Sequence, residues 1–150
     1  MSRVWLFVHL LGFVMWMGGG IASMFAGIAA KSEDRAGLGA VARAQSAVQR
    51  MVIGPGALLA VLSGLILTFG SVNLAAASPW LMVMQGAGLI AALLTLFVAV
   101  PTASRLARID PNGPDAAYFD ELRKRQKVVG MVWGVLALVA LVGGAMIRTA

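Results

Sequence analysis

The chain has 150 residues, of which 60% are hydrophobic and only 12% are charged, and its mean hydropathy is +0.89. This composition excludes an ordinary soluble globular domain and indicates an integral membrane protein. Cysteine is absent, which excludes disulfides, thiol catalysis and thiolate metal sites, and the formal net charge is +6.

Four long apolar runs follow one another along the chain, and each is long enough to cross a hydrocarbon core of about 30 Å as a helix. The first run carries no charge and is too long for the apolar part of a signal peptide, so it is predicted to be a retained span. The sequence therefore predicts an all-α, four-transmembrane-helix bundle that forms one domain over residues 1–150, with both termini on the same side. The predicted spans cover about residues 4–30, 51–74, 80–103 and 128–147.

The basic residues predict the orientation of the bundle. Ten of the twelve Lys and Arg residues lie in the first and third connections, residues 31–50 and 104–127. The positive-inside rule places these two connections in the cytoplasm and both termini on the periplasmic side of a bacterial inner membrane. Nucleic acid is not an expected partner, because the basic residues gather at helix ends with acidic residues among them. The ten residues are Lys31, Arg35, Arg43, Arg50, Arg105, Arg108, Arg123, Lys124, Arg125 and Lys127.

Local signals refine both connections and the second span. Apolar residues at near-helical spacing in residues 32–49 predict an extension of the second helix towards the headgroups. Residues 110–114 (DPNGP) predict a turn, after which Asp115 is positioned to cap a helix that leads into the fourth span. Gly54-Pro55-Gly56 predicts an irregular start of the second span. A phosphate site at residues 123–125 is an alternative to a solvated basic flank, but no glycine-rich loop accompanies it.

Small residues recur at four-residue spacing, which is typical of closely packed helices in a bilayer. We expect these faces to hold the bundle together and to contact further copies of the chain or other membrane subunits. The alternative interpretation is a groove that admits a flat cofactor such as a porphyrin. The sets are Gly19, Ser23 and Gly27; Gly56, Ala60 and Gly64; and Gly130 with Gly134.

His9 is the only histidine and lies about five residues inside the first apolar run. An imidazole in a span is costly without a partner, so it is the first candidate for function. The predicted cofactor-binding residues are His9, Gly12, Trp16 and, across the bundle, Gln85. As a metal site, His9 would be joined by the thioethers of Met82 and Met84, since imidazole and thioether suit haem iron or copper. The structural alternative is a hydrogen bond from His9 to Gln85 or to a main-chain carbonyl.

Acid–base catalysis has few candidate residues. All six carboxylates lie in the two basic connections, and the four spans contain no Asp, Glu, Lys or Arg. A proton-coupled transporter usually needs a carboxylate inside the membrane. The sequence therefore favours neither an enzyme nor a proton pump.

Three short motifs carry a resemblance to known families: His9–Gly19 (HLLGFVMWMGG), Leu62–Leu67 (LSGLIL) and Trp80–Met82 (WLM). They resemble small four-helix bacterial membrane proteins related to the copper-resistance D (CopD) domain. They also resemble the HemJ-type protoporphyrinogen oxidase and an uncharacterised family of predicted integral membrane proteins. The resemblance to HemJ implies haem b bound by the first-helix histidine, which is His9 here. The third-helix lysine of HemJ is absent, and Gln85 is the nearest polar residue.

Three functions are consistent with these observations. The first is a small membrane protein that binds haem b, or copper as the alternative, through His9 in a redox or haem- or copper-related role. The second is an accessory subunit of a larger membrane complex that binds no cofactor. The third is a HemJ-like porphyrin oxidase.

Overall fold

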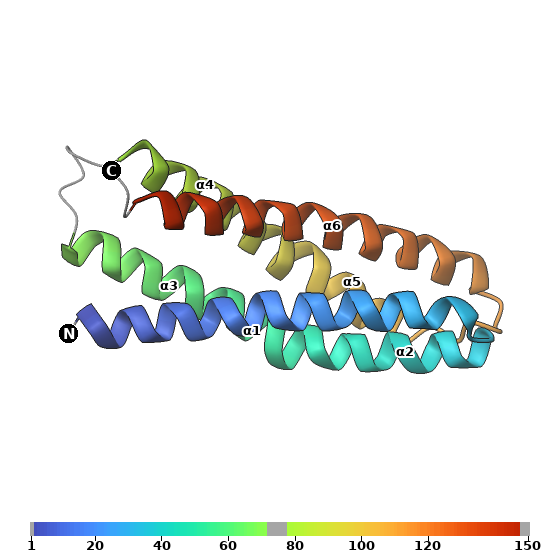
Figure 1. The fold of residues 1–150 in the computed structure, drawn as a ribbon. Coiled ribbons are helices and arrows are strands. Elements are labelled where there is room, and N and C mark those ends of the chain that lie inside the picture. The colour runs from blue at the N-terminus through green and yellow to red at the C-terminus, as the bar shows by residue number, and fades with distance from the viewer. Residues whose placement is uncertain (1, 72–77, 148–150) are drawn as a thin grey trace.

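The computed structural model describes residues 2–71 and 78–147, and every regular element within these ranges is a helix. The helices form four rods that run alongside one another, with the start of the first rod and the end of the fourth at the same end of the bundle (Figure 1). The first rod is α1 (Ser2–Ala29) with η1 (Ala30–Ser32); the second is α2 (Arg35–Val48), η2 (Gln49–Ile53) and α3 (Gly54–Ser71); the third is α4 (Pro79–Leu94), η4 (Thr95–Ala99) and α5 (Val100–Leu106); the fourth is α6 (Ala116–Met146).

The four rods confirm the predicted all-helical bundle of four spans. Stretches long and apolar enough to cross a membrane are Arg3–Ser32, Arg35–Gly70, Pro79–Leu106 and Ala116–Met146. Large apolar side chains such as Phe7, Phe69 and Phe97 are exposed on the outside of the bundle, as expected for surfaces that face lipid. The second and fourth rods begin well before their predicted spans, at Arg35 and Ala116 in the basic connections, whereas the third rod ends only three residues later than predicted, at Leu106. Residues 72–74 of the second predicted span lie outside the described residues.

The rods pack as two pairs, α1 with α3 and α4 with α6. The first pair crosses at two glycines. A Cβ on Gly12 would lie 2.6 Å from the Ala60 nitrogen, and one on Gly56 would lie 2.7 Å from the Trp16 nitrogen. Main chain therefore meets main chain at this crossing, which is how helices gain contact in lipid.

A tryptophan pair joins the two helix pairs at the centre of the bundle. Trp16 on α1 stacks on Trp133 on α6, with ring centroids 5.8 Å apart and planes 15° from parallel. Both rings are buried, together with Ile53 from η2 and alanines from α3, α4 and α6. Gly20 on α1 leaves room for the Trp133 ring, because a Cβ there would overlap it.

The second and third rods each contain a widened π-turn before a proline. In the second rod the Gly54 N–H donates to the Gln49 carbonyl, five residues back, and in the third rod the Val100 N–H donates to the Thr95 carbonyl. Pro55 and Pro101 each stand two residues after the end of the π-segment. A proline ring collides with the carbonyl of the residue four before it, and a widened turn relieves this contact. The predicted irregularity at Gly54-Pro55-Gly56 is confirmed as a π-turn that precedes the triplet.

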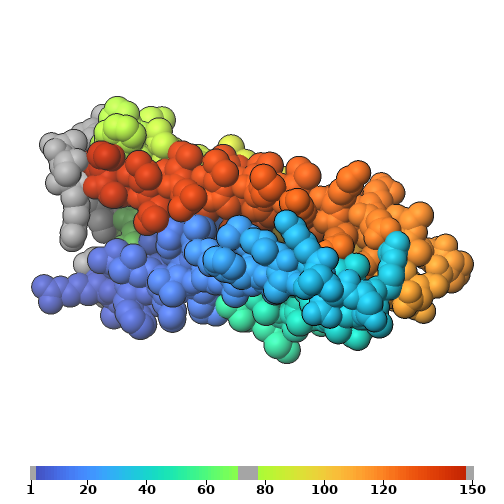
Figure 2. Space-filling view, turned by 45° about the vertical axis from the view of Figure 1, so that its right-hand side comes forward, coloured from blue at the N-terminus to red at the C-terminus, as the bar shows by residue number. Residues whose placement is uncertain are grey.

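Residues 30–50 and 104–127, here called the basic end, gather at the end of the bundle opposite the termini (Figure 2). They enclose a second small core of Ala42, Leu106, Phe119 and Leu122. Arg35 on α2 pairs with Asp120 on α6 at 2.9 Å, and both side chains are about half exposed. Such a pair contributes at most about 1 kcal/mol, so the apolar side chains supply most of the stability of this end.

Two predictions for the connections are confirmed and one is wrong. Within residues 32–49, α2 (Arg35–Val48) extends the second helix as predicted, and residues 110–114 form a turn in which Asp110 accepts from the Asn112 and Gly113 N–H groups. Asp115 precedes α6 as predicted, but its side chain makes no capping hydrogen bond. Its backbone, at φ −93° and ψ 19°, is not the extended conformation from which a side chain reaches the first free N–H groups of a helix.

Candidate functional site

His9 lies in the first third of α1, towards the end of the bundle that holds the termini, and it is half-buried against α3. Its Nδ1 nitrogen is 2.7 Å from the main-chain oxygen of Ala60. Because a carbonyl oxygen only accepts, Nδ1 must carry the proton and donate it. The structural alternative for His9, a hydrogen bond to a main-chain carbonyl, is therefore realised, and this bond ties α1 to α3.

Ser63 and Gly64 support the imidazole from α3. The Ser63 hydroxyl lies 3.4 Å from Nδ1, and it donates to the carbonyls of Leu59 and Ala60 on its own helix. A Cβ on Gly64 would lie 3.1 Å from Cε1 of the ring. Any larger residue at position 64 would push the ring away, so the Ser63-Gly64 pair fixes where the imidazole lies.

The second ring nitrogen, Nε2, is left without a hydrogen-bond partner among residues 2–71 and 78–147. It is also not one of the buried unpartnered atoms of this part of the chain, so it opens onto the surface. With the proton held on Nδ1, Nε2 is the basic, lone-pair-bearing nitrogen of a neutral imidazole. The arrangement can bind an electrophile, a metal ion or a proton at Nε2.

Gly12 and Trp16, which were predicted to bind a cofactor, both make packing contacts inside the bundle. Gly12 lies at the close crossing of α1 and α3, where the main chain of α3 fills the space next to it. Trp16 is 2% exposed, and its Nε1–H donates to the Thr95 hydroxyl on η4 at 3.1 Å. These two residues therefore pack the bundle one and two turns further along α1 than His9.

Gln85, Met82 and Met84 are not brought to His9 by any contact in the structure. Gln85 donates to the Thr68 hydroxyl at 2.6 Å, linking α4 to α3. Met82 is 70% exposed on the outside of α4, and the sulfur of Met84 packs 3.1 Å from the position of a Cβ on Gly144 in α6. The hydrogen bond that was considered between His9 and Gln85 is absent because both side chains have other partners. No group of three or more His, Cys, Asp or Glu residues that could hold a metal occurs in the described ranges.

Sequence reasoning missed the α3 half of the site, namely the Ala60 carbonyl, Ser63 and Gly64. A signal was present, because Ser63 and Gly64 belong to the Leu62–Leu67 motif that carries the family resemblance. The motif does not reveal which helix it faces. The partner of His9 is 51 residues away in the chain and depends on the packing of two helices.

Four apolar rods, an exposed apolar belt and a charged end define the chain as an integral membrane protein with four candidate spans. A family model described as predicted integral membrane protein (DUF2269) matches residues 3–148. The chain belongs to this family. No curated protein and no solved structure matches it. The resemblance to an uncharacterised membrane family is confirmed, whereas the resemblance to CopD and HemJ stays a prediction.

Proposed function

We propose that this membrane protein binds haem b through Nε2 of His9. One observation carries the proposal: Nδ1 donates to the Ala60 carbonyl, so in the neutral imidazole the lone pair lies on Nε2, which is open at the surface. Histidines that bind metals almost always donate their other ring N–H in this way, which fixes the tautomer and raises the basicity of the ligand.

A single nitrogen donor favours haem over a bare metal ion. Zinc needs three or four protein ligands and copper sites combine several imidazoles or sulfurs, while the macrocycle of haem leaves only one or two axial positions to the protein. Of the other predicted ligands, Gly12, Trp16 and Gln85 have partners inside the bundle. His9 would therefore be the one ligand that this chain supplies to the haem. A second would come from His9 of another copy across a two-fold axis, or the position would stay open for a small molecule.

The proposed haem would supply one-electron chemistry, and the chain's own residues would orient it. Ser63 and Gly64 hold the imidazole plane, and the Ala60 carbonyl sets its tautomer. With the basic end in the cytoplasm of a bacterial inner membrane, as the positive-inside rule favours, His9 would lie near the periplasmic surface. A HemJ-like oxidase is less well supported, because the lysine expected in the third helix is absent and no basic residue lies near Gln85 in the sequence.

The test is an optical spectrum, oxidised and dithionite-reduced, of the protein in mild detergent, with metal analysis on the same sample. His9→Asn is the decisive variant, because the Asn side-chain NH₂ occupies the place of Nδ1 and can still donate to Ala60, while Nε2 is deleted. We expect a Soret band in the wild type and its loss in His9→Asn, with the helical content unchanged. Gln85→Ala is the control and should keep the band. A colourless, metal-free wild type, or a Soret band that survives in His9→Asn, would overturn haem ligation by His9.

A second candidate, an accessory subunit that binds no cofactor, is favoured by one feature of α6. Gly130 and Gly134 were expected to pack the bundle, but a Cβ added at either would meet no described residue within 4 Å. A Cβ on Gly19 would meet Ile53, and one on Gly64 would meet His9. Two glycines one turn apart on an open face are suited to close contact with another helix. Gly134→Leu is then expected to leave the chain folded and to release a copurifying subunit or second copy, as read from the particle mass by light scattering. Gly18→Leu, also in open space, is the matched control. An unchanged mass in Gly134→Leu would count against this candidate.

A further inference from the structure

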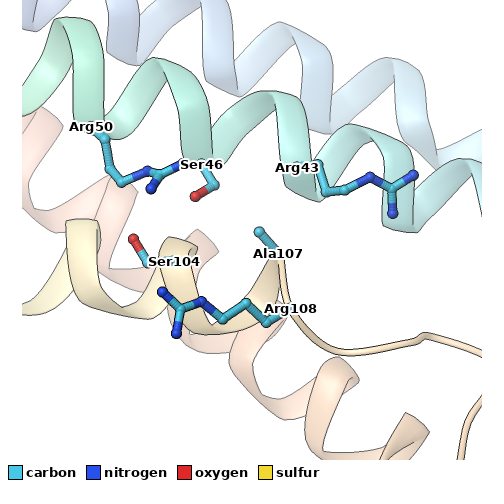
Figure 3. Close-up of a pocket in the computed structure, with 6 residues that line it drawn as sticks. All are labelled: Arg43, Ser46, Arg50, Ser104, Ala107 and Arg108. Atoms are coloured by element: carbon cyan, nitrogen blue, oxygen red, sulfur yellow. The ribbon is translucent and has the colours of Figure 1, made fainter.

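A hollow of about 280 Å³ lies at the basic end, between α2–η2 on one side and α5 on the other (Figure 3). Figure 3 shows Arg50 and Arg108 reaching into it from opposite sides, with the hydroxyls of Ser46 and Ser104 between them. Arg43 and Ala107 complete the lining. No acidic side chain lines this hollow.

The arginines of the hollow are not neutralised within the described part of the chain. Among the described residues, the ion pair is Arg35–Asp120, which lies outside the hollow. Arg43, Arg50 and Arg108 therefore have no described carboxylate within 4 Å. Like charges facing a shared hollow repel one another. An anion between them would turn this repulsion into attraction.

The hydroxyls indicate which anion fits. Ser46 is only 2% exposed as a residue, yet its hydroxyl neither makes a hydrogen bond nor belongs to the buried unpartnered atoms, so it opens to the hollow. The hydroxyl of Ser104, on the facing helix, likewise makes no hydrogen bond with residues 2–71 or 78–147. Guanidinium forks with hydroxyl donors on two sides match the several oxygens of a tetrahedral phosphate.

The depth of the hollow indicates where the phosphate comes from. A hydrocarbon core needs about 20 helical residues without charge, and the uncharged run of the second rod begins at Met51, which places the boundary next to Arg50. Arg43 and Arg108 lie further towards the basic end. The hollow is therefore level with the headgroups, where phospholipid phosphates are concentrated.

We propose that this hollow binds the phosphate group of an anionic phospholipid in the leaflet at the basic end. Basic pockets between membrane helices on this kind of face bind acidic lipid headgroups. A second hollow at this end contrasts with it, because both signs of charge are present in its lining of Ala117, Asp120, Glu121, Arg123 and Lys124. That mixed lining also argues against the phosphate site considered at residues 123–125.

The test uses the full chain in phosphatidylcholine vesicles that carry a trace of spin-labelled phosphatidylglycerol or spin-labelled phosphatidylcholine. The electron paramagnetic resonance spectrum gives the fraction of each labelled lipid that the protein immobilises. We expect the wild type to prefer the phosphatidylglycerol label. We expect the double variant Arg50→Gln/Arg108→Gln to lose this preference by about tenfold, since each basic residue near a membrane surface changes binding several-fold.

The matched control is Arg125→Gln/Lys127→Gln, which removes the same charge from exposed positions of α6 outside the hollow. An equal loss of preference in the two double variants would overturn the site, because general surface charge would then explain the binding. Inorganic phosphate is added in a parallel series, with chloride at matched ionic strength. A wild type that shows no preference for labelled phosphatidylglycerol, but binds inorganic phosphate saturably and does not bind chloride, would assign the hollow to free phosphate and overturn the lipid assignment.

Discussion

Replacing Gly12 by alanine is expected to destabilise the bundle by about 3 kcal/mol, although only one methyl group is added. The new Cβ would lie 2.6 Å from the Ala60 nitrogen and 2.8 Å from the Gly56 oxygen. Main-chain atoms inside a helix cannot move aside as the end of a side chain can. The helices α1 and α3 would have to separate, and the bond from His9 to Ala60 would lengthen with them. Titration of the purified protein with dodecyl sulfate, followed by circular dichroism, measures the loss.

Gly18→Ala is the matched control on the same helix. A Cβ at position 18 meets nothing within 4 Å, so the substitution only removes the conformational freedom of a helical glycine. Its expected effect is neutral or stabilising, by up to about 1 kcal/mol. If Gly12→Ala were as stable as Gly18→Ala, α1 and α3 could not approach as closely as the structure has them.

The contrast between these two glycines explains what glycine spacing in the sequence can predict. Spacing identified Gly56 and Gly64 as parts of a packing face, and both contact α1. The same spacing at Gly130 and Gly134 predicted packing as well, but this face is open within the chain. Four-residue spacing puts small residues on one side of a helix, whereas the identity of the neighbour depends on how four rods are rotated about their axes. A single sequence carries little information about those rotations.

Hydropathy predicted the parts of the helices that cross the membrane, but it did not predict how far the helices continue outside the membrane. The spans follow from the need to satisfy backbone groups in lipid. Beyond the bilayer boundary α2 and α6 continue, because Leu122, Phe119 and Ala42 have an apolar core of their own to fill. The π-turn before Pro55 was signalled by two flanking glycines. The equivalent turn before Pro101 lacks such neighbours and was not predicted.

His9 could be singled out from the sequence because an imidazole is rare and costly in a span. Its surroundings could not be predicted, since Ala60 contributes a main-chain oxygen, a group that every residue has. The predicted partners Gln85 and Met84 were chosen by chemical type at similar depth, but their hydrogen bond and packing are to α3 and α6. The chemical type of a residue limits which residues could belong to a site, but the rotation of each helix about its axis determines which of them reach His9.

Trp133→Ala is expected to cost about 3–5 kcal/mol and to loosen the contact between the two helix pairs. Trp133 is 4% exposed, and its ring fills the space between Gly20 of α1 and the stacked ring of Trp16. Alanine would leave a cavity at the point where the two pairs meet. The same dodecyl sulfate titration measures the loss of stability, and near-ultraviolet circular dichroism reports the loss of the stacked pair.

Replacing each tryptophan by phenylalanine separates stacking from hydrogen bonding. Nε1 of Trp133 is buried and has no partner in the described part of the chain, so Trp133→Phe removes an unsatisfied donor, which partly offsets the loss of buried area. Trp16→Phe instead removes the N–H that the Thr95 hydroxyl accepts, a buried hydrogen bond of about 1 kcal/mol. We therefore expect Trp16→Phe to be the more destabilising of the two, although both exchange one buried ring for the same smaller one. The reverse order would mean that Nε1 of Trp133 has an acceptor in the membrane, supplied by a lipid, a water molecule or a second subunit.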